Sequence, residues 1–165
     1  MTQDTDGFDT KLNILLKEWD YVQNHIGRFD TIIFSIRQWS VTVLAGLLAA
    51  AVAAKSPALM LSAVVPTGLF WFIDALHKSF QRRFISRGRE IEVYLSSPDF
   101  TEALRERTFA SFTSPRLSAQ FGVGTFRTRL NDVAHSALLR NVVVVHASLM
   151  CTCIVLYGFL QFIMR

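Results

Sequence analysis

The sequence has little charge and few of the residues that build compact chemical sites. Charged residues make up 18% of its 165 residues, whereas hydrophobic residues make up 51%. A small water-soluble domain cannot bury that much apolar surface, so part of the chain must face a solvent other than water. Its only two cysteines, Cys151 and Cys153, lie inside an apolar run, which excludes a disulfide framework and favours a simple packing role.

Sequence motifs of catalysis and metal binding are also missing. The chain has no HExxH, no paired-cysteine zinc pattern and no GxSxG, and Gly122-Val123-Gly124 lacks the Gly-Lys-Ser/Thr that completes a phosphate-binding loop. No nucleophile or base stands beside a second group that would activate it. We therefore expect no enzyme activity, no catalytic residue, no metal site and no cofactor.

Long hydrophobic runs are what the sequence does contain. Residues 39–73 include one charged residue, Lys55, and residues 141–164 include no Asp, Glu, Lys or Arg. A helix of roughly 20 apolar residues crosses a bilayer core of about 30 Å, so the first run is too long for one span. The turn Lys55-Ser56-Pro57 divides this run. We expect an all-α integral membrane protein with three transmembrane helices, at residues 38–54, 58–75 and 141–164.

The distribution of charge predicts the orientation of these spans. Residues 76–140 carry 11 Lys or Arg against 6 Asp or Glu, and basic segments flanking a span remain in the cytoplasm. Residues 1–37, which carry no signal-peptide pattern, then lie in the cytoplasm too. We expect a bacterial inner-membrane protein with a cytoplasmic N-terminus, a basic helical cytoplasmic segment over residues 76–140 and an external C-terminus.

Helix caps and breakers predict three local features. Pro66 and Gly68 should kink or loosen the second span near its middle unless neighbouring groups bond the freed backbone carbonyls. Ser97-Pro98-Asp99 should start a helix that runs to about Phe112. A last helix should begin near Thr125 and continue through Leu139 into the third span.

A heptad seam runs through the N-terminal segment. Its two positions recur every seven residues and stand three apart, as in a coiled coil: Leu12, Trp19, Ile26 and Ile33 at one, and Leu15, Val22, Phe29 and Ile36 at the other. On the first span, Gly46, Ala50 and Ala54 recur every fourth residue, which lets helix backbones approach closely in lipid. Packing within one chain and packing between copies both remain open for this row. Together with the seam, it favours a homo-oligomer.

Polar side chains inside the spans are the candidate functional residues. His146, Cys153, Tyr157 and Gln161 share one face of the third span, and such a stripe should avoid lipid. It either lines a water-filled path, which requires an oligomer because three spans alone enclose no pore, or it hydrogen-bonds to the other two spans. Asp74 at the inner end of the second span either pairs with nearby His77 and Lys78 or forms an ion-attracting ring in an oligomer.

A cluster of basic residues follows the second span, comprising Lys78, Arg82, Arg83, Arg87 and Arg89. Clustered cations beside a membrane typically bind anionic lipid headgroups. The same charges suit an anionic nucleotide or a short nucleic acid, and residues 76–140 are long enough to hold a soluble protein partner. The predicted partners are therefore the lipid bilayer, further copies of the chain, and one of these cytoplasmic ligands.

The order of these segments resembles a known family. An amphipathic helix at residues 11–37, a tight hairpin of spans at 39–73 and a charged helix from Lys78 are similar in plan to the small multi-span effectors of bacterial antiphage defence systems, including the SLATT type. The resemblance covers about the first 95 residues, and the third span departs from the two-span type. It implies a channel-forming or membrane-disrupting protein triggered by a cytosolic signal.

Two functions follow as expectations. The first is an oligomeric membrane channel or membrane-permeabilising effector controlled by its cytoplasmic segment, with antiphage defence as one setting. The alternative is a non-conducting membrane anchor or adaptor that recruits a soluble partner through residues 76–140. A transporter subunit is the weakest interpretation, because three spans without an internal repeat are few for that function.

Overall fold

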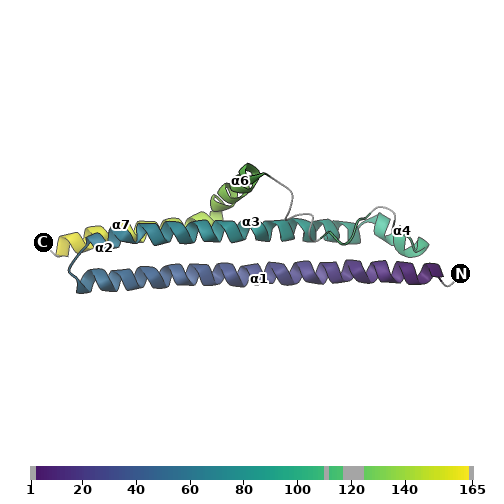
Figure 1. Ribbon diagram of the computed structural model, residues 1–165, viewed down its shortest axis with the longest axis horizontal. Coiled ribbons are helices and arrows are strands. Elements are labelled where there is room, and N and C mark those ends of the chain that lie inside the picture. Colours follow the sequence, from purple (N-terminus) through teal and green to yellow (C-terminus); the bar gives the residue numbers. More distant parts are fainter. Residues whose placement is uncertain (1–2, 110–111, 117–124, 164–165) are drawn as a thin grey trace. The chain divides into compact units, whose positions relative to one another are not determined.

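The computed structural model describes residues 3–109, 112–116 and 125–163, and these residues form helices and connecting segments with no strand among them. The helices are α1 (Gln3–Ala53), α2 (Ala58–Ser62), α3 (Val64–Leu95), α4 (Pro98–Glu106), α6 (Phe126–Ala137) and α7 (Arg140–Ile163) (Figure 1). The expected all-α class is confirmed. Three stretches, Gly7–Ala53, Ala58–Leu95 and Arg140–Ile163, are long and apolar enough to cross a membrane.

The turn between α1 and α2 lies where the sequence predicts it. Lys55 adopts a positive φ of 51°, and the Ser56 N–H bonds to the Ala51 carbonyl at 3.0 Å to close the end of α1. Pro57 is the N-cap of α2. Proline is tolerated at a helix start because the N–H that it lacks would have no partner there.

The second span-length stretch contains a short break instead of a kink at its middle. α2 ends at Ser62 and α3 begins at Val64, which places Pro66 in the first turn of α3. There its missing N–H removes no helical hydrogen bond. Thr67 continues the helix by donating from both its N–H and its hydroxyl to the Ala63 carbonyl, at 3.1 and 2.8 Å.

α4 is shorter than the helix predicted from Ser97 to about Phe112. Ser97 caps it as expected, because its hydroxyl accepts a hydrogen bond from the Phe100 N–H at 3.3 Å. Arg107 then turns into the left-handed region with φ 56°. The following Thr108 N–H bonds back to the Ala103 carbonyl, which ends the helix at Glu106.

The prediction of one helix from Thr125 into the third span is wrong. α6 and α7 are separate helices, divided by Leu138 and Leu139. The Leu139 N–H bonds to the Ser136 carbonyl at 3.2 Å, while the Leu139 carbonyl accepts from the Val142 N–H at 2.8 Å and starts α7. Figure 1 shows α6 leaving the line of α7 at this turn.

The chain divides into two compact units. Unit 1 comprises Met1–Arg28 and Phe80–Thr125, and unit 2 comprises Phe29–Ser79 and Phe126–Arg165. Both α1 and α3 contribute residues to each unit. Unit 1 thus joins most of the predicted N-terminal segment to much of the predicted basic segment.

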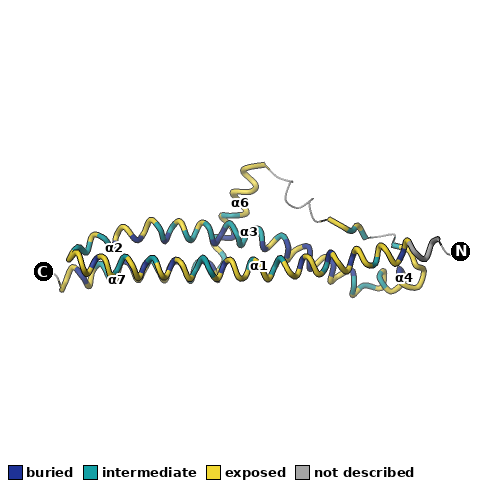
Figure 2. The backbone as a smooth tube through the Cα atoms, turned by 60° about the horizontal axis from the view of Figure 1, so that its bottom comes forward, coloured by how far each residue is buried: buried dark blue, intermediate teal, exposed yellow. Residues whose placement is uncertain are grey.

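Each unit has its own apolar core. In unit 1 the buried apolar side chains include Phe8, Leu15, Val22, Phe84 and Ile91. In unit 2 the main cluster of buried apolar side chains comprises Leu44, Ala51, Met60, Ala63, Cys153 and Leu160. Figure 2 shows buried positions recurring at intervals along α1 and α7 between exposed ones, the pattern of helices that bury one stripe.

Gly88 permits a close approach of α3 to α1 in unit 1. A Cβ atom at this position would lie 3.3 Å from Val22 Cγ1 and 3.9 Å from Ile26 Cδ1. Val22 is fully buried, so it has little room to move. A larger side chain at position 88 must therefore push the two helices apart.

Gly88→Leu should lower the free energy of unfolding of unit 1 by about 1–3 kcal/mol, the usual cost of overpacking. Gly27→Leu is the matched control, because a Cβ at that position meets nothing within 4 Å. Thermal unfolding followed by circular dichroism measures both variants. Equal loss of stability in the two would contradict a close approach at Gly88.

Candidate functional site

One carboxylate of α3 is completely buried inside unit 2. Asp74 Oδ2 accepts a hydrogen bond from Arg37 Nε of α1 at 2.8 Å and lies 2.9 Å from His146 Nε2 of α7. The side chains of Asp74 and His146 have no exposed surface, and that of Arg37 is 25% exposed. Each of the three span-length stretches thus contributes one ionisable side chain to this group, the Asp74 cluster.

Hydrogen bonding within the Asp74 cluster is incomplete. In its ion pair with Arg37, Asp74 is a carboxylate that only accepts hydrogen bonds, so the proton between it and His146 is on Nε2. Asp74 Oδ1, His146 Nδ1 and Arg37 Nη2 are buried without a partner among the described residues. Each unpaired buried group costs about 1–3 kcal/mol. The cluster joins three helices, but this arrangement does not use all of its hydrogen-bonding capacity.

Trp71 connects this cluster to the end of α6. Its ring lies nearly parallel to the His146 ring, with centroids 6.1 Å apart. Its Nε1–H donates to the Ala137 carbonyl at 3.1 Å. Trp71 therefore contacts His146 through the face of its ring and the C-terminal end of α6 through its indole N–H.

A second buried ionic group, the Glu18 cluster, lies in unit 1. Glu18 of α1 receives two hydrogen bonds from Arg87 of α3, from Nε at 2.8 Å and from Nη2 at 3.2 Å. The Ser114 hydroxyl and the Arg116 backbone N–H donate to the same carboxylate. The Glu18 and Arg87 side chains are only 1% and 3% exposed. Unlike Asp74, Glu18 has both oxygens fully engaged.

The Glu18 cluster also holds residues 112–116 in place. Arg87 Nη2 donates to the Thr113 carbonyl at 2.9 Å, and the guanidinium carbon lies 4.9 Å from the centroid of the Phe112 ring. That ring stacks on Tyr94 of α3 with centroids 4.3 Å apart. One ion pair thus fastens a non-helical segment to α1 and α3.

The hydrogen bonds around Glu18 set its acid–base behaviour. Burial raises the pKa of Glu18, but the hydrogen bonds from Arg87, Ser114 and the Arg116 N–H lower it by more, so its pKa lies below the ordinary 4.5. Glu18 precedes the predicted first span and belongs to unit 1. Its ionised form is therefore the one that stabilises the folded unit.

The members of the predicted polar stripe on the third span have different surroundings. His146 lies in the Asp74 cluster and Cys153 in the apolar core of unit 2. Tyr157 packs against that core, and its hydroxyl accepts a hydrogen bond from the exposed Gln161 at 3.2 Å. The arrangement favours contacts between helices of one chain over the lining of a water path.

The predicted packing residues of α1 fall into two groups. From the seam, Leu15, Val22 and Ile33 are buried within the chain, whereas Leu12, Trp19, Ile26, Phe29 and Ile36 are partly buried. Gly46, Ala50 and Ala54 are all exposed. The seam residues thus pack largely against other parts of the same chain, whereas the row of small residues does not.

The members of the predicted basic cluster have different surroundings. Arg87 is committed to Glu18, so it cannot serve as a ligand site while the Glu18 cluster is intact. Arg82 and Arg89 are exposed and line a groove of about 540 Å³ together with Gln23 and Glu92. The remaining members, Lys78 and Arg83, are partly buried.

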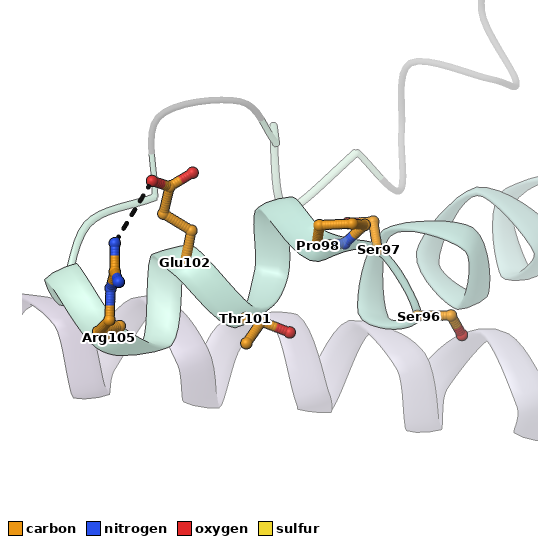
Figure 3. Close-up of a pocket in the computed structure, with 6 residues that line it drawn as sticks. All are labelled: Ser96, Ser97, Pro98, Thr101, Glu102 and Arg105. Atoms are coloured by element: carbon orange, nitrogen blue, oxygen red, sulfur yellow. Dashed lines mark ion pairs between the residues drawn. The ribbon is translucent and has the colours of Figure 1, made fainter.

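Figure 3 shows another groove of about 570 Å³, at the start of α4. Glu102 and Arg105 on its rim face each other at 3.8 Å, and both are exposed. It contains no buried polar group, so it is a weaker candidate than either ionic cluster. Within residues 3–109, 112–116 and 125–163, no three His, Cys, Asp or Glu side chains gather to hold a metal ion.

Arg37 and Glu18 are not among the residues predicted from the sequence. Both adjoin the heptad seam: Glu18 precedes Trp19, and Arg37 follows Ile36. Charged residues at such flanking positions commonly pair with a neighbouring helix. Their position beside the seam is the sequence signal that predicts an ion pair, but it does not identify the residue with which each one pairs.

Asp74→Ala should lower the free energy of unfolding by about 3–5 kcal/mol, because it leaves Arg37 and His146 without their shared anion. Asp20→Ala, which removes an exposed carboxylate of α1, is the matched control and should change little. Thermal unfolding of the purified protein in detergent measures both. If the two variants unfold at the same temperature, the Asp74 cluster does not hold the helices together.

Unit 1 should lose stability as the pH falls. Because folding lowers the pKa of Glu18, its contribution is complete above the ordinary value of 4.5 and disappears as the pH falls through the lower folded value. Hydrogen exchange of residues 112–116 across this range measures the loss. Glu18→Gln should exchange faster at neutral pH and show a weaker dependence on acid. An unchanged acid dependence in Glu18→Gln would assign the effect to other groups.

Comparison with known proteins identifies no relative: no protein-family model, no curated protein and no solved structure matches the chain.

Proposed function

We propose that this protein is an oligomeric membrane channel or membrane-permeabilising effector that crosses a bacterial inner membrane three times and is controlled by unit 1. The observation that carries the proposal is the Asp74 cluster, in which three span-length stretches share one buried ionic group. Ionisable side chains within membrane segments are costly, and they typically mark a switch or an ion path. The proposal includes antiphage defence as its setting, based on the similar plan of the first 95 or so residues.

The surface of the span-length stretches supports insertion into lipid. Val65, Val155 and Phe162 are exposed by 75%, 68% and 82%, and such large apolar side chains face lipid favourably. At 51 residues, α1 is about 77 Å long, whereas a bilayer core is about 30 Å thick. The rest of α1 extends into the cytoplasm, the side to which the basic residues around Arg82 and Arg89 assign it.

The outward face of α1 supports assembly from several copies. Gln38 and Thr42 are exposed there, followed by Ala45, Gly46 and Ala49. These residues lie on the side of α1 opposite to its buried residues, which include Leu44 and Ala51. Small and polar side chains in a membrane helix face other helices or water in preference to lipid. In the proposed assembly this face meets other copies and borders the conducting path.

The incomplete hydrogen bonding of the Asp74 cluster supports a gate. Arg37, Asp74 and His146 each have a buried nitrogen or oxygen atom that makes no bond within the described chain. A second arrangement that satisfies these atoms would recover the cost of leaving them unpaired, which suits an element with two states. In the proposed mechanism, a signal received by unit 1 shifts α1 and α3, breaks the Arg37–Asp74 pair and opens the path.

Purified protein in planar bilayers should conduct ions, and Gly46→Leu should reduce that conductance about tenfold or more, because a bulky side chain separates closely packed helices. Gly158→Leu on α7 is the matched control, since a Cβ atom added at either glycine would meet nothing within 4 Å in the single chain. The control variant should conduct like the original protein. Crosslinking in membranes reports the oligomer in the same samples.

Two results would overturn the channel proposal. One is the absence of conductance in the full chain under all conditions, including added nucleotides. The other is equal conductance in Gly46→Leu and Gly158→Leu with an unchanged oligomer. If the full chain does not conduct but captures a soluble protein, the adaptor function replaces the channel proposal. That alternative is favoured by a groove of about 480 Å³ in unit 1, beside the 64% exposed Val93.

A further inference from the structure

Helix α6 has an apolar stripe that is uncovered over its first half. Phe126, Leu130, Val133 and Ala137 are spaced by four, three and four residues, which places them on one face of a helix. Phe126 is 78% exposed and Leu130 is 46% exposed. Leu138, directly after the helix, is 75% exposed as well. Val133 and Ala137, toward the end of α6 that is anchored within unit 2, are partly buried, whereas Phe126 and Leu130 at the start of the helix are exposed.

The rest of the α6 surface is mostly polar, and its exposed charged residues are two arginines and one carboxylate, Asp132. Thr128, Asn131 and His135 are exposed and lie on the face opposite to the apolar stripe. Arg127 and Arg129 are exposed too. At about 100° per residue, these two arginines flank the stripe on its two sides. Cations beside an apolar stripe are typical of helices that lie in a membrane surface.

The position of α6 in the chain fits this pattern. Two residues, Leu138 and Leu139, separate it from the start of the span-length helix α7 at Arg140. The Ala137 carbonyl is held by the Trp71 indole N–H at 3.1 Å, and tryptophan favours the boundary between lipid and water. The apolar stripe of α6 therefore ends at the level where the proposed third span enters the membrane.

We propose that α6 is an interfacial helix that binds anionic lipid on the cytoplasmic surface of the bilayer. Phe126, Leu130 and Val133 insert among the acyl chains, while Arg127 and Arg129 contact phosphate groups of anionic lipids. The turn at Leu138 and Leu139 allows α6 to lie along the surface where α7 crosses it. This inference rests on the proposed membrane insertion of α7, but it does not require a channel.

Spin labels on the full-length protein test this placement. In a background of Cys151→Ser and Cys153→Ala, single cysteines replace Phe126 or Leu130 on the stripe and Thr128 or His135 opposite to it. The protein is reconstituted into phosphatidylcholine vesicles containing phosphatidylglycerol. Labels on the stripe should be accessible to oxygen and protected from a water-soluble nickel chelate, and labels on the opposite face should show the reverse.

A label at Val155→Cys separates this inference from the proposed function. If that label lies in lipid but the stripe labels are open to the nickel chelate, the interfacial helix is wrong and the membrane insertion of α7 stands. If the stripe labels are shielded from both reagents, protein covers α6, and the lipid proposal is again wrong. If the Val155→Cys label lies in water, the membrane proposal fails together with this inference.

Charge variants test the preference for anionic lipid. Arg127→Ala combined with Arg129→Ala should reduce the equilibrium constant for binding of α6 to the membrane surface about fivefold for each arginine removed, in vesicles with phosphatidylglycerol. Thr128→Glu with Asn131→Glu changes the net charge by the same amount on the opposite face and should have a smaller effect. In pure phosphatidylcholine, removal of the arginines should have little effect. Equal effects in both lipids would overturn the role of the arginines.

Discussion

The burial of one carboxylate constrains the packing of unit 2. Asp74 has no exposed surface, and an unpaired charge in such a place costs more than the surrounding apolar contacts return. α1 and α7 can pack beside α3 at this point because they supply Arg37 and His146. The apolar core around Leu44 and Met60 fills the space between helices, whereas the ionic contact selects which helix faces meet.

The two clusters differ in how completely the polar atoms around the buried carboxylate are hydrogen-bonded. Glu18 accepts four hydrogen bonds, from Arg87, Ser114 and the Arg116 backbone. The Asp74 cluster leaves three polar atoms unpaired within the described chain. A fully bonded ion pair suits a fixed connection, such as the one that holds residues 112–116. A partly bonded cluster is easier to rearrange, which is why the proposed gate is assigned to Asp74.

Residue spacing predicts the helices of this protein much better than it predicts their contacts. The span-length stretches and the buried seam positions Leu15 and Val22 follow from hydrophobic periodicity, because burial along a helix repeats with its turn. The pairing of Arg37 with Asp74 depends on which helix lies opposite, which no local pattern encodes. The turn at Leu138 and Leu139 escapes prediction for a similar reason. Leucine favours helix, so contacts such as that between Trp71 and Ala137 must contribute to this turn.

The helical course of α1 within unit 1 restricts how the length of this chain can change during evolution. α1 supplies Leu15 and Val22, seven residues apart, to the core of unit 1. One residue inserted between them would rotate the later side chains of α1 in this unit by about 100° and would turn Val22 out of the core. An insertion of seven residues would restore the facing to within about 20°. Natural variation in this part of α1 should therefore occur in whole heptads.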